Sequence, residues 1–404
     1  MLMGSAIALL TPMTPFAGGI AIFALLAVLV SSLAAEEKGA AGSAAAPTGI
    51  AAVLQPFVDR HALAGAVTLV ASKDKVLSLE AVGFSDVAAN RPLRTDALFW
   101  VASQSKPVTA TAFMMLVDEG KVNVEDAVEK YLPEFKDQML AAGKDPKETP
   151  ARKPAHPIKV REILSHTSGM AFASPIEQPT LDLLPLRDAV RSYATTPLQY
   201  EPGSKYQYSN AGVNTAGRII EVVSGMPYEE FLQKRLFDPL GMKDTTFWPN
   251  DEQLQRLAKS YKPNAAKTGL EEITISQLKY PLTDRTKRFP MPAGGLFSTA
   301  PDMGRFCQMI LNGGELDGTR YVSEAAVKQM TSKQTPDALK DGYGFGWGVG
   351  GGCFGHGGAY STDMTIDPKR GLIMVFLVQH AGFPGDGDKS HGAFKQAAYR
   401  LFGK

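Results

Sequence analysis

The chain has 404 residues, of which 44% are hydrophobic and 21% are charged, a composition typical of an ordinary globular protein and too apolar for a disordered one. Its 42 lysines and arginines nearly balance 41 aspartates and glutamates, which leaves a formal net charge of +1. Without a dense basic block, nucleic acid and strongly acidic partners are disfavoured, and a small neutral or weakly charged substrate is expected.

Residues 1–35 carry no charged side chain and contain an apolar run at 20–30, which is followed by small residues. This order is typical of a secretory signal peptide cleaved after residue 34 or 35, although basic residues before the apolar run are missing. An uncleaved membrane anchor is the alternative, because the uncharged stretch approaches the length of a membrane span. We therefore expect an exported protein, periplasmic or extracellular, that is either free or anchored through residues 1–35.

Residues 36–49 are rich in alanine and glycine and are expected to form a mobile spacer, so the folded domain should span residues 50–404. β-Hairpins are predicted near both ends of this domain, because strand-like apolar runs flank polar turns there. The strands are expected at 66–70 and 76–82 in the first hairpin, and at 363–366 and 372–378 in the second.

Helical periodicity dominates between the hairpins, at 108–119 and 211–223, and a C-terminal helix is expected at 393–402. The pattern predicts an α/β (α+β) fold in which both chain ends build a sheet-containing part and the middle of the chain forms an inserted helical part. The approximate boundaries are 50–110 and 285–404 for the α/β part and 111–284 for the helical part. Small-molecule sites commonly lie between such parts.

Cys307 and Cys353 are the only cysteines, and they lack the C-x-x-C spacing of a zinc site. We expect both cysteines to be small residues of the core or of a strand edge. A disulfide between them is compatible with export but has no support in the sequence. The six histidines show no H-E-x-x-H spacing, and no G-x-S-x-G motif of an α/β-hydrolase is present. His166, in a short Ser/Thr-rich stretch, is expected to be a structural turn residue rather than a metal ligand.

The first candidate catalytic motif is S-x-x-K at Ser103 and Lys106, at the start of a predicted helix. Three residues make nearly one helical turn, so the hydroxyl and the amine should lie on the same face. A serine becomes a good nucleophile only beside a base, and a helix N-terminus favours the developing oxyanion. Alone, however, the motif also fits an N-cap serine. The S-x-x-K sequence also occurs at Ser72, in a predicted hairpin turn, and at Ser276, in a polar segment.

Two further motifs follow. Tyr208-Ser209-Asn210 is the only Y-x-N in the chain, and its tyrosine could serve as a base or relay a proton beside an ammonium group, although an aromatic residue before a helix more often only packs. The third, from Gly355 to Ala359 with sequence GHGGA, precedes a predicted strand, and its glycines would let a substrate approach the backbone closely. A flexible glycine-rich turn is the alternative interpretation of that segment.

Taken in order, the three motifs resemble the active-site set of the serine β-lactamase and penicillin-recognising superfamily: S-x-x-K, then Y-x-N or S-x-N, then K-T-G or H-x-G. The nearest branch is class C-like and includes class C β-lactamases, D-alanyl-D-alanine carboxypeptidases, D-aminopeptidases and family VIII carboxylesterases. The resemblance implies a five-stranded antiparallel sheet flanked by helices, plus a helical domain, and no metal or organic cofactor. It runs from about residue 50 to residue 402 and includes segments 163–169, 237–242 and 294–300 with Asp302 and Met303.

The resemblance also implies roles. Ser103 would be the nucleophile that is acylated, Lys106 would lower the cost of deprotonating it, and Tyr208 would be the general base and then the acid. The other site residues would be Ser103 and Ala359 as N–H donors of the oxyanion hole, and Asn210, His356, Gly357 and Gly358 in substrate binding.

The third motif departs from the β-lactamase pattern, because His356-Gly357 stands where Lys-Thr binds the carboxylate of the drug. A histidine is mostly neutral at pH 7, and losing a charge-assisted pair removes about 1.5–3 kcal/mol of carboxylate recognition. We therefore expect a carboxylesterase-type activity on small esters. β-Lactamase, D-alanyl-D-alanine carboxypeptidase or D-aminopeptidase activity on a β-lactam or amide is the alternative, and a non-catalytic penicillin-binding-like protein is a further one.

Overall fold

The computed structural model describes residues 49–143, 151–340 and 342–403. The predicted signal peptide or anchor, 1–35, lies outside these residues. So does the predicted spacer, 36–49, except for Gly49, which begins the first helix. Within the described part of the chain, no helix has both the length and the apolar character needed to span a membrane.

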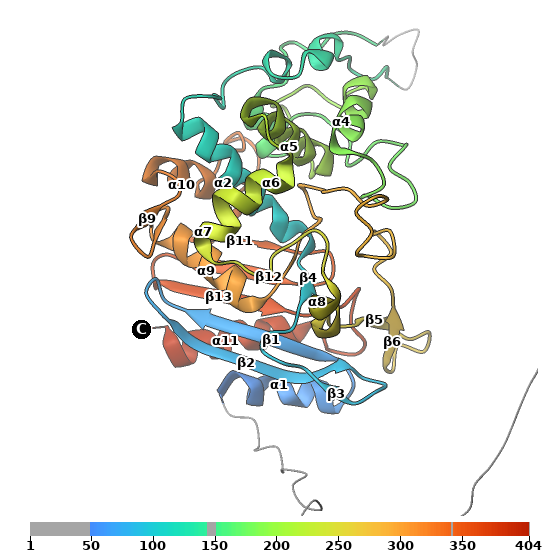
Figure 1. The fold of residues 1–404 in the computed structure, drawn as a ribbon, viewed down its shortest axis with the longest axis vertical. Coiled ribbons are helices and arrows are strands. Elements are labelled where there is room, and N and C mark those ends of the chain that lie inside the picture. Colours follow the sequence, from blue (N-terminus) through green and yellow to red (C-terminus); the bar gives the residue numbers. More distant parts are fainter. Residues whose placement is uncertain (1–48, 144–150, 341, 404) are drawn as a thin grey trace, which may run out of the picture. The chain divides into compact units, whose positions relative to one another are not determined.

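A seven-stranded antiparallel sheet, in the order β10-β11-β12-β13-β1-β2-β3, forms the lower half of the view in Figure 1. The sheet therefore has seven strands rather than the five that the resemblance implied. The additional strands are short edge strands, Arg-Pro in β3 and Gly-Val-Gly in β10. The strands are β1 (Gly65–Ala71), β2 (Val76–Asp86), β3 (Arg91–Pro92), β10 (Gly348–Gly350), β11 (Cys353–Gly357), β12 (Asp363–Asp367) and β13 (Leu372–Leu377).

Both predicted hairpins are confirmed, because β1 pairs with β2 and β12 pairs with β13 in antiparallel register. The two chain ends meet in the middle of the sheet, where β1 lies beside β13 and Val67 faces Leu377. The sheet is thus built from both ends of the domain, as expected. The predicted limits of a separate helical part, at 111 and 284, stay a prediction.

Helices cover both faces of the sheet (Figure 1). Helices α1 (Gly49–Asp59) and α11 (Lys389–Phe402) pack on one face, and α9 (Ala300–Leu311) packs on the other. Every residue of β1 is consequently buried: Val67 and Leu69 point into the larger core, and Ala66 and Val70 into the core beneath α1 and α11. This two-sided burial explains why the strand is apolar at every position except Thr68.

The predicted helices at 108–119, 211–223 and 393–402 are confirmed as α2 (Ser105–Asp118), α5 (Asn210–Ser224) and α11. Helix α2 is buried along almost its whole length and contacts α5.

The other described α-helices are α3 (Val160–Leu164), α4 (Leu186–Thr195), α6 (Tyr228–Leu232), α7 (Asp238–Leu240), α8 (Asp251–Arg256) and α10 (Glu324–Thr331). Short 3-10 turns occur at η1 (Ala102–Gln104), η2 (Val128–Lys130) and η3 (Pro133–Asp137), and a π-turn at η4 (Gln233–Phe237). Small two-stranded ladders join β4 (Phe99–Trp100) to β7 (Phe297–Ser298), β5 (Ser260–Pro263) to β6 (Leu270–Ile273) and β8 (Glu315–Leu316) to β9 (Thr319–Arg320).

The cysteines occupy the positions expected of core and strand-edge residues. Cys307 is fully buried in α9, where its Sγ lies 3.7 Å from the Sδ of Met364, and Cys353 is half-buried in β11. Both are free thiols.

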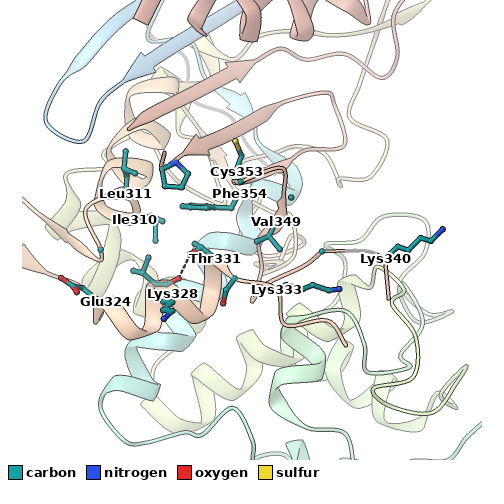
Figure 2. Close-up of a pocket in the computed structure, with 17 residues that line it drawn as sticks. Ile310, Leu311, Glu324, Lys328, Thr331, Lys333, Lys340, Val349, Cys353 and Phe354 are labelled. Carbon is teal, nitrogen blue, oxygen red and sulfur yellow. Dashed lines mark hydrogen bonds between the residues drawn. The ribbon is translucent and has the colours of Figure 1, made fainter. Parts of the chain in front are cut away.

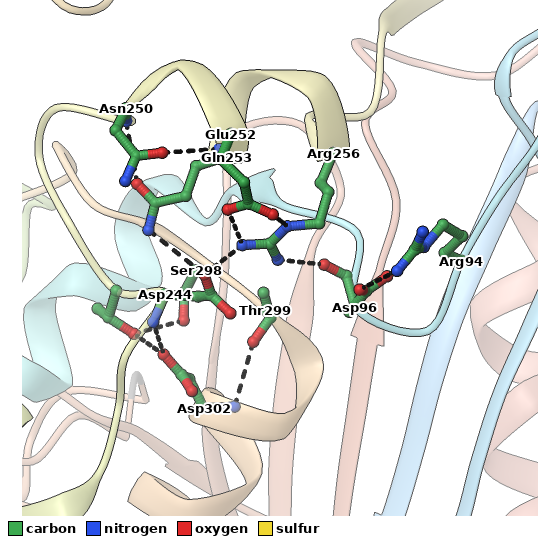
Figure 3. Close-up of polar contacts among 11 residues, drawn as sticks. Arg94, Asp96, Asp244, Asn250, Glu252, Gln253, Arg256, Ser298, Thr299 and Asp302 are labelled. Carbon is green, nitrogen blue, oxygen red and sulfur yellow. Dashed lines mark hydrogen bonds and ion pairs between the residues drawn. The ribbon is translucent and has the colours of Figure 1, made fainter.

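A buried polar cluster ties the segment after α7 to the first turn of α9 (Figure 3). The Thr299 hydroxyl caps α9 by accepting a hydrogen bond from the Asp302 N–H. The Asp302 carboxyl accepts from the Asp244 N–H and from the Thr245 hydroxyl, both at 2.8 Å. Burial raises the pKa of Asp302 to about 6, because these two neutral donors do not replace the lost hydration.

We expect Asp302→Asn to stabilise the protein above pH 6 and to have little effect near pH 4. The pKa of Asp302 is higher in the folded state than in the unfolded state, so its stability contribution is complete below about pH 4 and is lost as the pH rises through about 6. A difference of about two pH units between the folded and unfolded pKa values corresponds to about 3 kcal/mol, the upper limit of the gain. Asparagine keeps an acceptor oxygen without the charge. Urea unfolding at pH 4.5, 6 and 8 measures the effect, and an equal loss of stability at every pH would contradict it.

Candidate active site

Ser103 lies in the 3-10 turn η1, immediately before α2, rather than in the first turn of the helix as the sequence suggested. The preceding residue, Ala102, has a φ of 47°, a left-handed conformation that is costly for an alanine. The Ser105 hydroxyl holds this turn in place: it donates to the Ala102 carbonyl at 2.6 Å and accepts from the Leu296 N–H at 3.2 Å. Residues with strained backbone conformations cluster at functional sites, and Ala102 directly precedes Ser103.

Lys106 is completely buried and connects the first two motifs. Its Nζ lies 3.1 Å from the Ser103 Oγ, 2.8 Å from the Asn210 Oδ1 and 2.6 Å from the carbonyl oxygen of Ala293. None of these partners is negatively charged. Burial therefore lowers the pKa of the Lys106 amine well below its usual value, which favours the neutral form.

Tyr208 lies directly before α5, and its ring centre is 4.5 Å from the Lys106 Nζ. The helix is capped by Ser209, whose hydroxyl accepts from the Gly212 N–H. Burial raises the pKa of the Tyr208 phenol above its usual value, and the hydrogen bond with Ser103 opposes this effect only in part. The phenol is consequently neutral near pH 7. The first two motifs thus meet as expected.

His166 contacts the second motif, a role that the sequence did not suggest. It has a φ of 61°, in keeping with the expected turn residue, and it is buried. Its Nδ1 accepts from the Ser209 N–H at 3.1 Å, which leaves the ring proton on Nε2, and its ring centre lies 4.4 Å from that of Tyr208. Burial lowers the pKa of His166 well below its usual value. A neutral imidazole therefore positions the Tyr208 segment.

His356 lies in β11 with its ring close to Tyr208, at 6.1 Å between ring centres. The Nδ1 donates to the Gly357 carbonyl at 2.6 Å, so the Nε2 accepts from the Tyr343 hydroxyl at 2.9 Å. Burial lowers the pKa of His356 to about 4. The imidazole is therefore neutral at pH 7 and cannot act as a cationic anchor.

Gly358 allows the third motif to pass close to the nucleophile segment. A Cβ at this position would lie 2.6 Å from the carbonyl oxygen of Val101 and 2.1 Å from the Thr362 hydroxyl oxygen, so only glycine fits. The exposed Ala359 follows immediately. Its role as an N–H donor of the oxyanion hole stays a prediction.

Two cavities flank the β10–β11 hairpin. The larger, about 730 Å³, lies between this hairpin, α10 and the end of α9, and it contains none of the candidate catalytic residues (Figure 2). The smaller, about 470 Å³, is lined by Tyr208, His356 and Gly357. This smaller cleft lies beside the second and third motifs, although neither Ser103 nor Lys106 is among the residues that line it. Among the described residues, no cluster of three or more histidine, cysteine or carboxylate side chains could hold a metal ion.

An antiparallel sheet covered by helices on both faces, with S-x-x-K beside Y-x-N, is the architecture of the serine β-lactamase and penicillin-binding protein superfamily. The family model described as Beta-lactamase matches residues 50–398, and the chain belongs to this family.

The chain is similar to two curated bacterial proteins. It is 32% identical to Protein Rv1367c of Mycobacterium tuberculosis over 368 residues, which cover 82% of this chain and 90% of that protein. It is 29% identical over 327 residues to a Salmonella newport protein named as a proposed D-alanyl-D-alanine carboxypeptidase, with 71% of this chain and 70% of that protein covered.

Similar solved structures extend over almost the whole described chain. A penicillin-binding protein homologue from Caulobacter crescentus has a TM-score of 0.67 at 25% identity and covers 88% of this chain and 98% of its own. The fold is also shared with EstCE1, a hydrolase with promiscuous acyltransferase activity, with a TM-score of 0.72 at 24% identity over 87% of this chain and 97% of that one. Simvastatin synthase (LovD) from Aspergillus terreus likewise has a TM-score of 0.72, at 20% identity over 87% of this chain and 98% of that one.

Proposed function

We propose that the protein is a serine hydrolase that forms an acyl-enzyme on Ser103 and acts mainly on small esters. The observation that carries the proposal is the environment of Lys106: a fully buried amine, with no anionic partner, whose Nζ lies 3.1 Å from the Ser103 Oγ. A neutral amine at this distance can accept the serine proton, which is the step that a hydroxyl nucleophile needs.

In the proposed reaction the Ser103 Oγ attacks the ester carbonyl while its proton passes to the Lys106 amine. The N–H groups of Ser103 and Ala359 bind the oxyanion. Tyr208 donates its phenolic proton to the departing alkoxide and is reprotonated from the Lys106 ammonium. Water then attacks the acyl-enzyme by the reverse proton route, releasing the acid and restoring Ser103. Because the pKa of Lys106 is lowered and that of Tyr208 is raised, we give the first proton transfer to Lys106, not to the tyrosine that the family resemblance suggested as the base.

The preference for esters rests on the uncharged third motif. His356 is neutral, and its Nε2 is occupied by the Tyr343 hydroxyl. The lysine that lines the same cleft, Lys395, is paired with Asp363 at 3.3 Å. A substrate carboxylate therefore meets no unpaired cation among the described residues of the cleft. D-Alanyl-D-alanine carboxypeptidase activity, which the name of the Salmonella relatives suggests, requires recognition of such a carboxylate and is the second candidate.

Purified protein should hydrolyse p-nitrophenyl butyrate with a kcat/KM far above that for nitrocefin, because only nitrocefin depends on binding a carboxylate. His356→Lys should improve nitrocefin turnover by about ten- to hundred-fold, the range expected for a hydrogen bond to a charged group. The neutral variant His356→Gln, as the matched control, should not improve it. A wild-type kcat/KM for nitrocefin, or a rate on a D-alanyl-D-alanine peptide, equal to that for the ester would overturn the ester preference.

A further inference from the structure

A chain of buried hydrogen bonds leads away from Lys106 to a carboxyl group that the proposed reaction does not use. The Ala293 carbonyl accepts from the Lys106 Nζ at 2.6 Å, and the Ala293 N–H donates to the Asn214 Oδ1 at 3.0 Å. The Asn214 Nδ2 donates to the Tyr193 hydroxyl at 3.0 Å, which itself donates to the Glu177 carboxyl at 2.6 Å. No member of the chain is more than 3% exposed.

The links from Ala293 to Tyr193 have only one possible direction. The Ala293 N–H can only donate, so the Asn214 amide oxygen faces it and the amide NH₂ faces Tyr193. The single phenolic proton of Tyr193 is then free for Glu177, whose second oxygen accepts from the Ser174 N–H at 2.7 Å. No ion pair to Glu177 occurs among the described residues, and burial raises its pKa. A buried network with every member satisfied holds its atoms rigidly.

The geometry around the amine gives this network a consequence for catalysis. A neutral lysine has two N–H groups and one lone pair. If the N–H groups donate to the Asn210 Oδ1 and the Ala293 carbonyl, the lone pair faces the third neighbour, the Ser103 Oγ. Both acceptors depend on α5, because Asn210 belongs to it and Asn214, one turn later, holds Ala293.

We propose that Asn214, Tyr193 and Glu177 are positioning residues that hold the Ala293 carbonyl against Lys106, so that the lone pair of the amine stays directed at Ser103. The inference rests on the proposed serine hydrolase function. The other titratable groups whose rings lie close to Lys106 or Tyr208 are Tyr208, His166 and His356; all three are neutral near pH 7, because the pKa of Tyr208 is raised and those of both histidines are lowered. A shift of the acid limb of the pH profile therefore reports on Lys106 rather than on these groups.

The test compares Asn214→Leu and Tyr193→Phe with Thr215→Val, a matched control that removes a buried hydroxyl from the same helix outside the network. The readouts are kcat and KM for p-nitrophenyl butyrate from pH 5 to 10, together with urea unfolding. Asn214→Leu should lower kcat at least ten-fold with KM changed less than two-fold, and Tyr193→Phe should lower kcat about three- to ten-fold. Losing the carbonyl acceptor disfavours the ammonium form, so the acid limb should move to lower pH by at least half a unit in both variants. Thr215→Val should lose stability only.

Wild-type kcat and an unmoved acid limb in a folded Asn214→Leu would overturn the positioning role. If that variant does not fold, Tyr193→Phe decides, since it loses a single oxygen atom. Failure of the proposed function is separable, because it would appear as wild-type protein that does not react with a fluorophosphonate at Ser103.

Discussion

Ser103→Ala should reduce ester hydrolysis by about 10⁴-fold or more, because loss of a nucleophile removes the acyl-enzyme route entirely. The variant should keep its fold, since the serine is only half-buried and its hydroxyl contacts Lys106 and Tyr208 rather than the core. Steady-state hydrolysis of p-nitrophenyl butyrate and mass spectrometry after fluorophosphonate treatment measure the two aspects, rate and covalent labelling.

Two serines serve as matched controls, because each also begins an S-x-x-K sequence. Ser72 lies in the β1–β2 turn, where its hydroxyl bonds with the backbone of the exposed Lys75, and Ser276 lies in a loop beside Tyr360. Ser72→Ala and Ser276→Ala should retain nearly full activity and labelling. Full activity in Ser103→Ala would remove the basis of the proposed mechanism.

Lys106→Met should lower kcat/KM by about 10²–10⁴-fold, the usual contribution of a general base. Methionine is unbranched and apolar and suits a fully buried site, so the variant tests the amine rather than the space it fills. Because Lys106 and Ser103 act as one unit, the double variant Ser103→Ala/Lys106→Met should be no slower than Ser103→Ala alone. Stopped-flow acylation measures the step directly. A variant that retains more than about a tenth of wild-type activity would assign the base to another group.

The parts of the fold that could be predicted are those governed by short-range pattern. Strand and helix periodicity located both hairpins and helices α2, α5 and α11, and the three-residue spacing of Ser103 and Lys106 predicted their contact because it spans about one helical turn. The edge strands β3 and β10 could not be predicted, because an Arg-Pro pair and a Gly-Val-Gly segment have no intrinsic strand preference.

The residues that position the catalytic groups could not be predicted either, because no local sequence pattern marks them. His166 bonds with Ser209, 43 positions later, and Asn214 bonds with Ala293, 79 positions later. Such contacts depend on which segments pack together in the folded chain, and a buried histidine or asparagine looks the same in sequence whether or not it has such a partner. The pKa directions at Lys106 and Tyr208 were equally hidden, because they follow from burial.

The pairing of β1 with β13 has a consequence for how the chain acquires its structure. Val67 meets Leu377 across more than three-quarters of the sequence, so β1 gains its second neighbour only when almost all of the protein has been synthesised. At about 5–20 residues per second, the ribosome takes about 15–60 s to make the intervening chain. Until β13 is available, β1 has an open edge, which is prone to association with other chains. Folding through so non-local a contact is slow.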